Sequence, residues 1–421
     1  MYEELTKLYE SDEYPLHMPG HKRVDGFGQI DDAIKVDITE IDGYDDLYNP
    51  EGIIKDALDR AKKIYNTKKT YFLVNGSTVG ILTSIFAVIP QGGKALIARN
   101  CHKSVYHALE LRDIYTDYLK LNQENGIYDV VDPKQLEEKL KENQYDAVII
   151  TSPTYEGRVS DIKELSNICH GYDVPLIVDE AHGAHFIFSN RFPKSAVEYA
   201  DVVIQSTHKT LPTLTQTALL HVNFGRVDIK KIDKYLQMFQ TSSPSYVLMS
   251  SIDSCLTDLS QSGEKAWDYF FENISGFKQK TAELNNLSMV ETDDPCKIVI
   301  STVGTDINGP KLAKILLDKY HLQIEMASAA YVIAIVTIND TKEGFGRLAK
   351  ALCEIDKSVN KQTESSIDSV ELGYLLDAKV KDYIYIYPPG IPIVTPGETI
   401  EKEQLETIAE YIQAGLKVRG L

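Results

Sequence analysis

The sequence predicts an α/β protein built on a mostly parallel sheet of seven strands, with a smaller α/β domain toward its C-terminal end. The first observation is that short apolar runs alternate with helix-like stretches between about residue 50 and residue 225. Such alternation is typical of a parallel sheet covered by helices on both faces. The second observation is a change to shorter strands from about residue 291. The seven candidate strands of the large sheet are Thr70–Val74, Ala95–Ala98, Tyr118–Leu121, Ala147–Thr151, Leu176–Asp179, Val202–Gln205 and Ala218–Val222.

The remaining elements suggest three parts: an N-terminal arm over residues 1–45, a large domain over 46–290 and a small C-terminal α/β domain over 291–421. Helix-like stretches of the large domain include Lys103–Tyr115, Pro133–Glu142, Ile162–His170, Lys230–Phe239, Tyr246–Ser260 and Glu264–Leu284. The small domain is expected to hold the strands Ile298–Ser301, Gln323–Met326, Tyr331–Val336 and Tyr383–Tyr387 and the helix Gly309–Tyr320.

The arm is expected to begin with a short helix and to continue as an extended segment through Pro15 and Pro19. An arm without a core of its own must lie on another surface, either its own large domain or a second subunit. Together with two-fold dimers being the commonest assembly, this favours a homodimer or a multiple of one. The stretch Lys361–Asp368 is the most linker-like part of the chain.

Composition indicates an ordinary soluble protein: 43 % of residues are hydrophobic and 25 % are charged. No apolar run approaches the roughly 20 residues of a membrane helix, and the segment Met1–Leu5 lacks the pattern of a secretory signal. The net charge of −18 makes nucleic acid an unsuitable partner. The five scattered cysteines do not suggest a disulfide framework, so we expect a cytoplasmic protein.

Lys209 lies in the polar segment Gln205–Thr210, directly after the apolar run Asp201–Ile204. Sheets of this type place their ligands at the carboxyl ends of strands. A lysine at such a position, next to His208 and hydroxyl side chains, is a candidate for Schiff-base chemistry. A solvated loop lysine would produce the same short pattern.

Asp179 ends the preceding apolar strand, and a carboxylate there has either a site duty or the duty of capping a helix. His182 and His185 follow it, about one helical turn apart, which raises the alternative of a metal pair. No glutamate lies where a zinc-protease helix would need one. Two loop histidines bonded to the backbone are the simpler interpretation, and we predict no metal.

A possible anion site precedes the apolar helix-like run Ile81–Ile89. Gly76, Ser77 and Thr78 supply a glycine and two hydroxyls where this helix starts, and free N–H groups and the helix dipole favour a phosphate at such a place. An ordinary N-cap by either hydroxyl is the alternative. His102 comes just after the strand Ala95–Ala98 and either lies on the face of a flat cofactor ring or is a surface loop histidine.

Taken with further segments, these stretches resemble the Orn/Lys/Arg decarboxylases, which are fold-type I enzymes that use pyridoxal 5′-phosphate (PLP). Each motif alone is unspecific, but their order and spacing together are specific, and the resemblance covers most of the chain. It is to the short form of the family, because large members carry an extra domain before the first of these segments. The further segments are His17–Lys22, Asp37–Glu40, Asp45–Leu47, Tyr387–Pro392 and Pro396–Glu398.

The resemblance implies PLP as cofactor and a role for each candidate residue. Lys209 would form the Schiff base, and Asp179 would keep the pyridine nitrogen protonated so that the ring accepts electrons. His102 would stack on the ring, Ala181 would line it, and His182 would lie near its phenolic oxygen or the substrate. Either Lys209 or His208 would return a proton to Cα. The phosphate cup would be formed by Gly76, Ser77, Thr78, Ser206 and possibly His208.

Two loops carry an expectation from the family and an ordinary alternative. The loop Thr151–Gly157 would line the cofactor, or it is a plain connection between a strand and a helix. The loop Thr241–Ser245 would reach the phosphate site of a neighbouring subunit, or it caps the helix that starts at Tyr246.

The resemblance implies decarboxylation of arginine, lysine or ornithine, in polyamine and basic amino acid metabolism, with arginine slightly ahead. Glu398 is the candidate partner of the substrate's distal cation, or else a solvated turn residue. Aminotransferases of this fold hold the α-carboxylate with an arginine of the small domain. After residue 226 only Arg347 and Arg419 are present, and neither is expected on a strand facing the site. Desulfurase-like or aldolase-like chemistry and a non-catalytic PLP-binding relative stay open.

Overall fold

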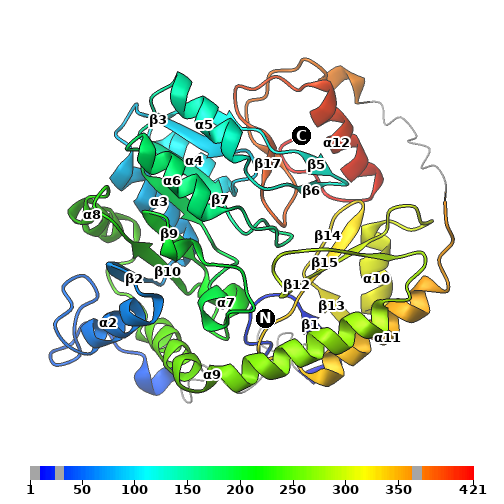
Figure 1. The fold of residues 1–421 in the computed structure, drawn as a ribbon, viewed down its shortest axis with the longest axis horizontal. Coiled ribbons are helices and arrows are strands. Elements are labelled where there is room, and N and C mark those ends of the chain that lie inside the picture. The colour runs from blue at the N-terminus through cyan, green and yellow to red at the C-terminus, as the bar shows by residue number, and fades with distance from the viewer. Residues whose placement is uncertain (1–9, 24–32, 363–371) are drawn as a thin grey trace.

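The computed structural model describes residues 10–23, 33–362 and 372–421. In Figure 1 the large sheet and its helices form one half of the molecule, and the smaller sheet lies in the other half. The long helix α9 (Tyr246–Thr281) runs along one edge and joins the two halves. No helix within the described ranges is long and apolar enough to cross a membrane.

The large sheet has seven strands in the order β2-β10-β9-β8-β7-β3-β4. All neighbouring pairs are parallel except those of β10, which runs antiparallel to both β2 and β9. The mostly parallel seven-stranded sheet expected from the sequence is therefore confirmed. The strands are β2 (Lys69–Leu73), β3 (Lys94–Ala98), β4 (Tyr115–Leu119), β7 (Ala147–Thr151), β8 (Leu176–Asp179), β9 (Val202–Gln205) and β10 (Ala218–Val222).

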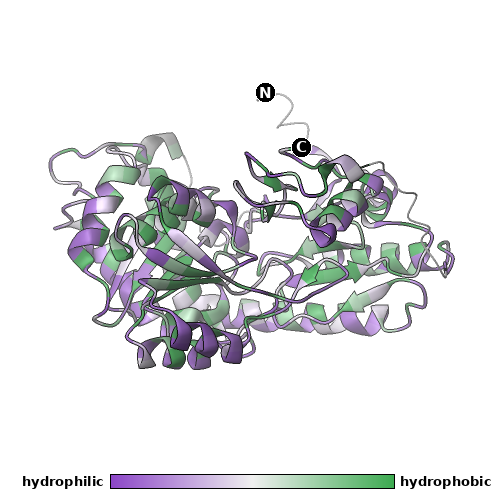
Figure 2. Ribbon diagram, turned by 90° about the horizontal axis from the view of Figure 1, so that it is seen from above, coloured by the Kyte–Doolittle hydropathy of each residue, from purple (hydrophilic) through white to green (hydrophobic). Residues whose placement is uncertain are grey.

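Every residue of β8, β9 and β10 is buried. Both faces of this sheet are therefore covered, as expected for a mostly parallel sheet packed between helices. Figure 2 shows the hydrophobic residues gathered inside each half of the molecule and the hydrophilic ones facing outward. A short hairpin of β5 (Gln123–Glu124) and β6 (Ile127–Tyr128) extends beyond the sheet. The helices are α2 (Ile53–Tyr65), α3 (Gly76–Val88), α4 (Lys103–Leu111), α5 (Pro133–Glu142), α6 (Ile162–Gly171), α7 (Thr207–Thr210) and α8 (Ile229–Phe239).

One helix and the strand after it differ from the expected bounds. The helix α4 ends at Leu111 rather than Tyr115, and β4 already begins at Tyr115. Asp113 takes a left-handed conformation with φ of 53°, which no residue inside an α-helix can hold. The chain therefore turns there, and the strand starts three residues before the expected Tyr118.

The helix α9 is continuous over 36 residues, whereas the sequence suggested two helices. The expected break fell near Gly263, which is buried between Leu259 and Trp267 of the same helix. A glycine inside a helix costs about 1 kcal/mol. Burial of Trp267 and Phe270, both at most 1 % exposed, outweighs that cost.

The small sheet is antiparallel, with the order β11-β12-β15-β14. The expected strand Gln323–Met326 is split between two sheets, with Glu325 at the break between β13 and β14. The helix α11 packs along α9 (Figure 1). The elements are β11 (Ser288–Val290), β12 (Lys297–Ser301), α10 (Gly309–Tyr320), β13 (Leu322–Ile324), β14 (Met326–Ala327), β15 (Tyr331–Ile335) and α11 (Lys342–Asp356).

The C-terminal segment forms a small cluster with its own buried residues, among them Ile384, Val394 and Ile408. Of the expected strand Tyr383–Tyr387, only two residues are paired. The division into arm, large domain and small domain stays a prediction. The elements here are β16 (Ile384–Tyr385), β17 (Pro392–Val394) and α12 (Lys402–Gln413).

The arm lies partly on the large domain, which was one of the two surfaces expected for it, and partly on the small domain, which was not. Its strand β1 (Tyr14–Leu16) pairs in parallel with β13 of the small domain, because that edge offers unpaired backbone groups. Further along, the N–H of Gly20 donates to the carbonyl of His208 over 2.7 Å, which brings the arm beside Lys209. The short helix expected at the start of the arm, and most of the linker-like stretch, fall outside the described residues.

Candidate active site

The carboxyl ends of β8 and β9 bring Asp179 and Lys209 to one edge of the sheet. The two strands are parallel and Asp179 is in register with Ile204, so both chains leave the sheet at the same level. The short helix α7 begins after Ser206 and carries Lys209 in its only turn. The position expected for a ligand in this fold is therefore occupied by a carboxylate and a lysine.

His182 contacts two lysines. Its Nε2 lies 3.2 Å from Nζ of Lys209, and its Nδ1 lies 2.7 Å from Nζ of Lys297. The ring of Tyr155 meets the imidazole edge-on, with 5.0 Å between ring centres. His182 is buried, so its orientation is fixed by these three neighbours.

Burial makes the charged forms of these groups costly. It lowers the pKa of Lys209, and the carboxylates of Asp179 and Glu325 only partly oppose that effect. It also raises the pKa of Asp179, although the positive charge of Lys209 works against the rise. Burial, and then the charges of Lys209 and Lys297, hold the pKa of His182 well below its usual range. His182 is therefore a neutral imidazole, and Lys209 is a weaker base than an exposed lysine side chain.

Part of the expected phosphate cup has donors without a partner among the described residues, although the N–H of Gly76 donates to the carbonyl of Gln216 over 2.9 Å. Ser206 is fully buried, yet its Oγ has no hydrogen-bond partner among the described residues. The helix α3 starts at Gly76, which has φ of 76°, and Asn75 before it gives no side-chain cap. Ser77 and Thr78 line this uncapped first turn. A buried hydroxyl without a partner and an open helix N-terminus fit a bound phosphate group.

His102 lies where the sequence placed it, at the end of β3 and the start of α4. Its Nδ1 accepts the N–H of Ser104 over 3.2 Å, which fixes the plane of the ring. Burial and the nearby charge of Lys209 lower the pKa of His102 to about 3. Gly390 covers it from the C-terminal segment, where a side chain would come within 3.3 Å of Nε2. A neutral, immobile imidazole near Lys209 suits a ring-stacking role.

Ala181 and His208 support the arrangement through backbone contacts. The N–H of Ala181 donates to Oδ1 of Asp179 over 3.1 Å, and its carbonyl accepts the N–H of Ser206. Nδ1 of His208 lies 2.7 Å from the carbonyl of Thr217, so Nδ1 carries the proton and donates. Burial lowers the pKa of His208 to about 4. His208 is thus a neutral neighbour of Lys209.

Two residues of the site were missed from the sequence, Lys297 and Glu325, whereas Tyr155 lies in the loop Thr151–Gly157 that was expected to line the cofactor. Lys297 opens β12, one residue before the expected strand. Glu325 accepts the hydroxyl of Tyr155 over 2.7 Å and the N–H of Met18 over 2.9 Å. The available signal for Lys297 and Glu325 was their position beside short apolar strands, since Lys297 begins β12 and Glu325 directly follows β13.

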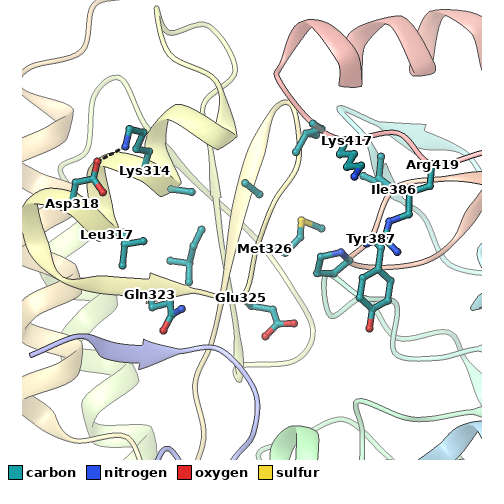
Figure 3. A pocket seen from close by; sticks show the side chains of 15 residues that line it. Lys314, Leu317, Asp318, Gln323, Glu325, Met326, Ile386, Tyr387, Lys417 and Arg419 are labelled. Atoms are coloured by element: carbon teal, nitrogen blue, oxygen red, sulfur yellow. Dashed lines mark hydrogen bonds and ion pairs between the residues drawn. The ribbon is translucent and has the colours of Figure 1, made fainter. Parts of the chain in front are cut away.

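A groove of about 510 Å³ runs between the small sheet and the C-terminal segment and reaches Glu325. Figure 3 shows Gln323, Glu325 and Met326 on one wall and Tyr387 and Arg419 on the other. The sequence did not place Arg419 near the site. It reaches this wall because its backbone pairs with Tyr385, which brings the chain end back over the groove.

Glu398 lines a different cavity, of about 530 Å³, between β4, the segment before β17 and α12. Its Oε2 accepts Nη2 of Arg99 over 3.0 Å and the N–H of Thr395 over 2.7 Å. The structure does not bring Glu398 into contact with Lys209. Pro389 and Ile391 line this cavity as well, and Gly390 between them lies against His102.

The two histidines that could have formed a metal pair serve separate networks. His182 binds the two lysines, whereas Nε2 of His185 lies 3.0 Å from Oδ1 of Asp294. The hydroxyl-rich loop after α8 begins beside the first turn of α3, where the N–H of Thr241 donates to Asn75 over 3.0 Å.

The chain resembles known decarboxylases over its whole length. Residues 1–302 match the Orn/Lys/Arg decarboxylase major domain, and residues 339–419 match the C-terminal domain of the same family. An arginine decarboxylase of Bacillus anthracis is 30 % identical, over 96 % of this chain and 91 % of that protein.

Solved structures share the fold. The constitutive lysine decarboxylase of Escherichia coli superposes with a TM-score of 0.74 at 20 % identity, over 88 % of this chain and 72 % of the other. A structure of SPT (serine palmitoyltransferase) with PLP superposes with a TM-score of 0.64 at 13 % identity, over 82 % of this chain and 87 % of the other. The fold-type I architecture expected from the sequence is thereby confirmed.

Proposed function

The chain belongs to the Orn/Lys/Arg decarboxylase family and is a decarboxylase of basic amino acids, and from this premise we propose that it acts on arginine with PLP held by Lys209. The observation that carries the proposal is the placement of Lys209 at the end of β9, in contact with His182 and level with Asp179. The arginine decarboxylase relative supports the choice of arginine within the family.

The residues present suit PLP. Lys209 would hold the cofactor covalently, Asp179 would pair with its pyridine nitrogen, and His102 would lie on its ring. The uncapped turn of α3 and the free hydroxyl of Ser206 would receive its phosphate. When bound, PLP supplies an electron sink for the pair of electrons left by departing CO₂.

The chain's own groups manage the proton that must then reach Cα. Lys209 and His208 are both candidate donors. Nδ1 of His208 already donates to a backbone carbonyl, so only its Nε2 is free to take up a further proton. Because burial lowers the pKa of His208 to about 4, this ring is rarely charged at neutral pH. That leaves Lys209 as the donor we favour, once it has taken up a proton from the α-ammonium group of the substrate.

Glu398 remains our proposed partner for the distal cation of the substrate. Its Oε2 is taken by Arg99 and by a backbone N–H, but Oε1 makes no hydrogen bond among the described residues. A guanidinium group binds a carboxylate in a two-pronged fashion that an ammonium group cannot copy. Glu398 lines one cavity with Pro389 and Ile391, and Gly390 between these two lies against His102.

We also propose that the protein works in the cytoplasm as a homodimer or a multiple of one. Thr241 lies beside the first turn of α3, so the loop it begins would sit at the edge of the phosphate site. Light scattering of the active protein measures the assembly. A monomeric mass with full activity would contradict the dimer.

Trapping the cofactor tests the assignment of Lys209. Borohydride reduction of the PLP-loaded protein, followed by peptide mapping, should place the pyridoxyl group on Lys209. A label on Lys297, the other lysine in contact with His182, would overturn the assignment.

A further inference from the structure

Lys297 is held firmly in the active site although no motif assigns it a role. Its side chain is 3 % exposed, and its Nζ lies 2.7 Å from Nδ1 of His182. Gly157 packs against its stem so closely that a Cβ there would lie 2.7 Å from Cγ of Lys297. The ammonium group therefore has one fixed position, directly against the imidazole.

Lys297 stays charged at neutral pH even though burial disfavours its charged form. Burial lowers the pKa of Lys297 to about 8, so the group is still mostly protonated at pH 7. The ring of Tyr155 lies 5.3 Å from its Nζ and stabilises a cation. An ammonium group has only donors, so Nδ1 of His182 must accept. The titratable groups that face Lys297 are Asp294, Glu325, Lys209, Cys296, Tyr155 and His182.

His182 is neutral, and a neutral imidazole carries a single N–H. Since Nδ1 accepts from Lys297, the proton is on Nε2, which lies 3.2 Å from Nζ of Lys209. An N–H can donate only to a nitrogen that has a lone pair, and Lys209 has one only as the neutral amine. The titratable groups that face His182 are Lys209, Lys297, His208, His185 and Tyr155.

The opposite arrangement would place the charge on Lys209 and leave Lys297 neutral. The two contact lengths distinguish these arrangements, because hydrogen bonds from a charged donor are the shorter ones. The contact of His182 with Lys297 is 2.7 Å and that with Lys209 is 3.2 Å. The groups that face Lys209 are Asp179, Glu325, His182, His102, His208 and Lys297, and Lys209 forms no ion pair with either carboxylate.

We propose that Lys297 is a positioning residue that acts through His182: its ammonium group fixes the Nε2–H tautomer of His182 and so keeps Lys209 a neutral amine. The inference rests on the proposed function in one respect, that Lys209 is the lysine to which the cofactor bonds. Only the neutral amine has the lone pair needed to attack the carbonyl carbon of a cofactor.

The tautomer can be read directly in the wild-type protein. Nitrogen-15 NMR of the full-length, cofactor-free chain labelled at histidine reports which ring nitrogen carries a proton, and His182→Gln identifies the signal. We expect a protonated Nε2 and an unprotonated Nδ1 at pH 7. A protonated Nδ1, or a charged ring, would overturn the proposal whether or not the protein decarboxylates any amino acid.

The charge on Lys209 is tested by the pH dependence of PLP capture, followed by absorbance on the cofactor-free chain. In Lys297→Met the loss of a nearby positive charge should raise the midpoint by about one to two pH units. Capture at pH 7 should then slow by about two- to tenfold. An unchanged midpoint in folded Lys297→Met would overturn the proposal.

Two further variants control this measurement. Lys22→Met removes another buried ammonium group, one that donates to backbone carbonyls, and should keep the wild-type midpoint. Lys297→Arg retains a cationic donor and should restore most of the wild-type value. Mapping the captured PLP separates the two ideas: a label on a lysine other than Lys209 contradicts the proposed function, whereas a label on Lys209 with an unshifted midpoint contradicts only the role of Lys297.

Discussion

The hydroxyl of Tyr155 donates a hydrogen bond of 2.7 Å to Oε1 of Glu325 and so joins the large and small sheets across the active site. Tyr155 follows β7, and Glu325 lies between β13 and β14. The other carboxylate oxygen accepts the N–H of Met18 in the arm. Because Glu325 opposes the lowering of the pKa of both Lys209 and Lys297, its position bears on the charge of each lysine.

Removing this bond should loosen the site. Tyr155→Phe leaves a carboxylate oxygen without its donor, and we expect the free energy of unfolding to fall by about 1–3 kcal/mol, measured by urea denaturation. Tyr145→Phe is the matched control, because that hydroxyl donates to Asp117 over 2.7 Å at a distance from the site. Both variants should lose stability, but only Tyr155→Phe should reduce turnover. Equal turnover in the two would remove Tyr155 from the active site.

Asp179 should matter for turnover more than for cofactor binding. Without its carboxylate the pyridine nitrogen loses the partner that keeps it protonated, so Asp179→Ala and Asp179→Asn should bind PLP and lose about a hundredfold or more of turnover. Absorbance measures the bound cofactor, and amine release measures turnover. Wild-type turnover in either variant would refute the assigned role.

Glu398 should affect substrate binding alone. Glu398→Gln should raise the Michaelis constant for the true substrate about tenfold or more while PLP affinity stays the same, since a charge-assisted hydrogen bond is lost. Glu403→Gln alters an exposed carboxylate of the same cavity and should leave both constants unchanged. Identical kinetics in Glu398→Gln and the wild type would show that the distal cation binds elsewhere.

The titration of Glu180 should make the free energy of unfolding fall over a defined range of pH. Burial raises the pKa of Glu180 from 4.5 to about 7. The unfolded chain therefore loses this proton at lower pH than the folded one, and stability falls as pH rises from about 4.5 to about 7. A shift of this size is worth about 3 kcal/mol.

Glu180→Gln should abolish that part of the pH dependence. The difference in unfolding free energy between wild type and variant, measured by urea denaturation at pH 5 and pH 8, should change in favour of the variant at pH 8. The absolute unfolding free energies will also depend on the hydrogen bonds that Ser195 and Gln205 donate to Glu180. If the difference were the same at pH 5 and pH 8, Glu180 would not titrate between these two pH values.

The parts of the site that follow directly from local sequence were predictable. Asp179 and Lys209 each come just after an apolar strand, and parallel strands end at one edge, so their proximity follows from the pattern alone. The uncapped glycine turn before α3 is equally local. These features depend only on the strand order of one sheet.

The contacts that the sequence did not reveal depend on packing between distant segments. Lys297 and Tyr155 are more than 100 positions apart in the chain, and they meet because the small sheet is placed against the loop after β7. Arg419 returns to the groove through a single backbone pairing with Tyr385. The unbroken helix α9 has the same origin, since burial of its aromatic side chains overrides the glycine in its middle.

The central claim is that this protein removes the α-carboxyl group of a basic amino acid, with arginine as the substrate. The most direct measurement is to incubate the purified protein with PLP and with arginine, lysine or ornithine in turn, and to identify any amine formed. We predict release of the amine of arginine with one CO₂ per turnover, and little or no amine from lysine and ornithine. Preferential turnover of lysine or ornithine would contradict the substrate, and no amine from any of the three would contradict the decarboxylase itself.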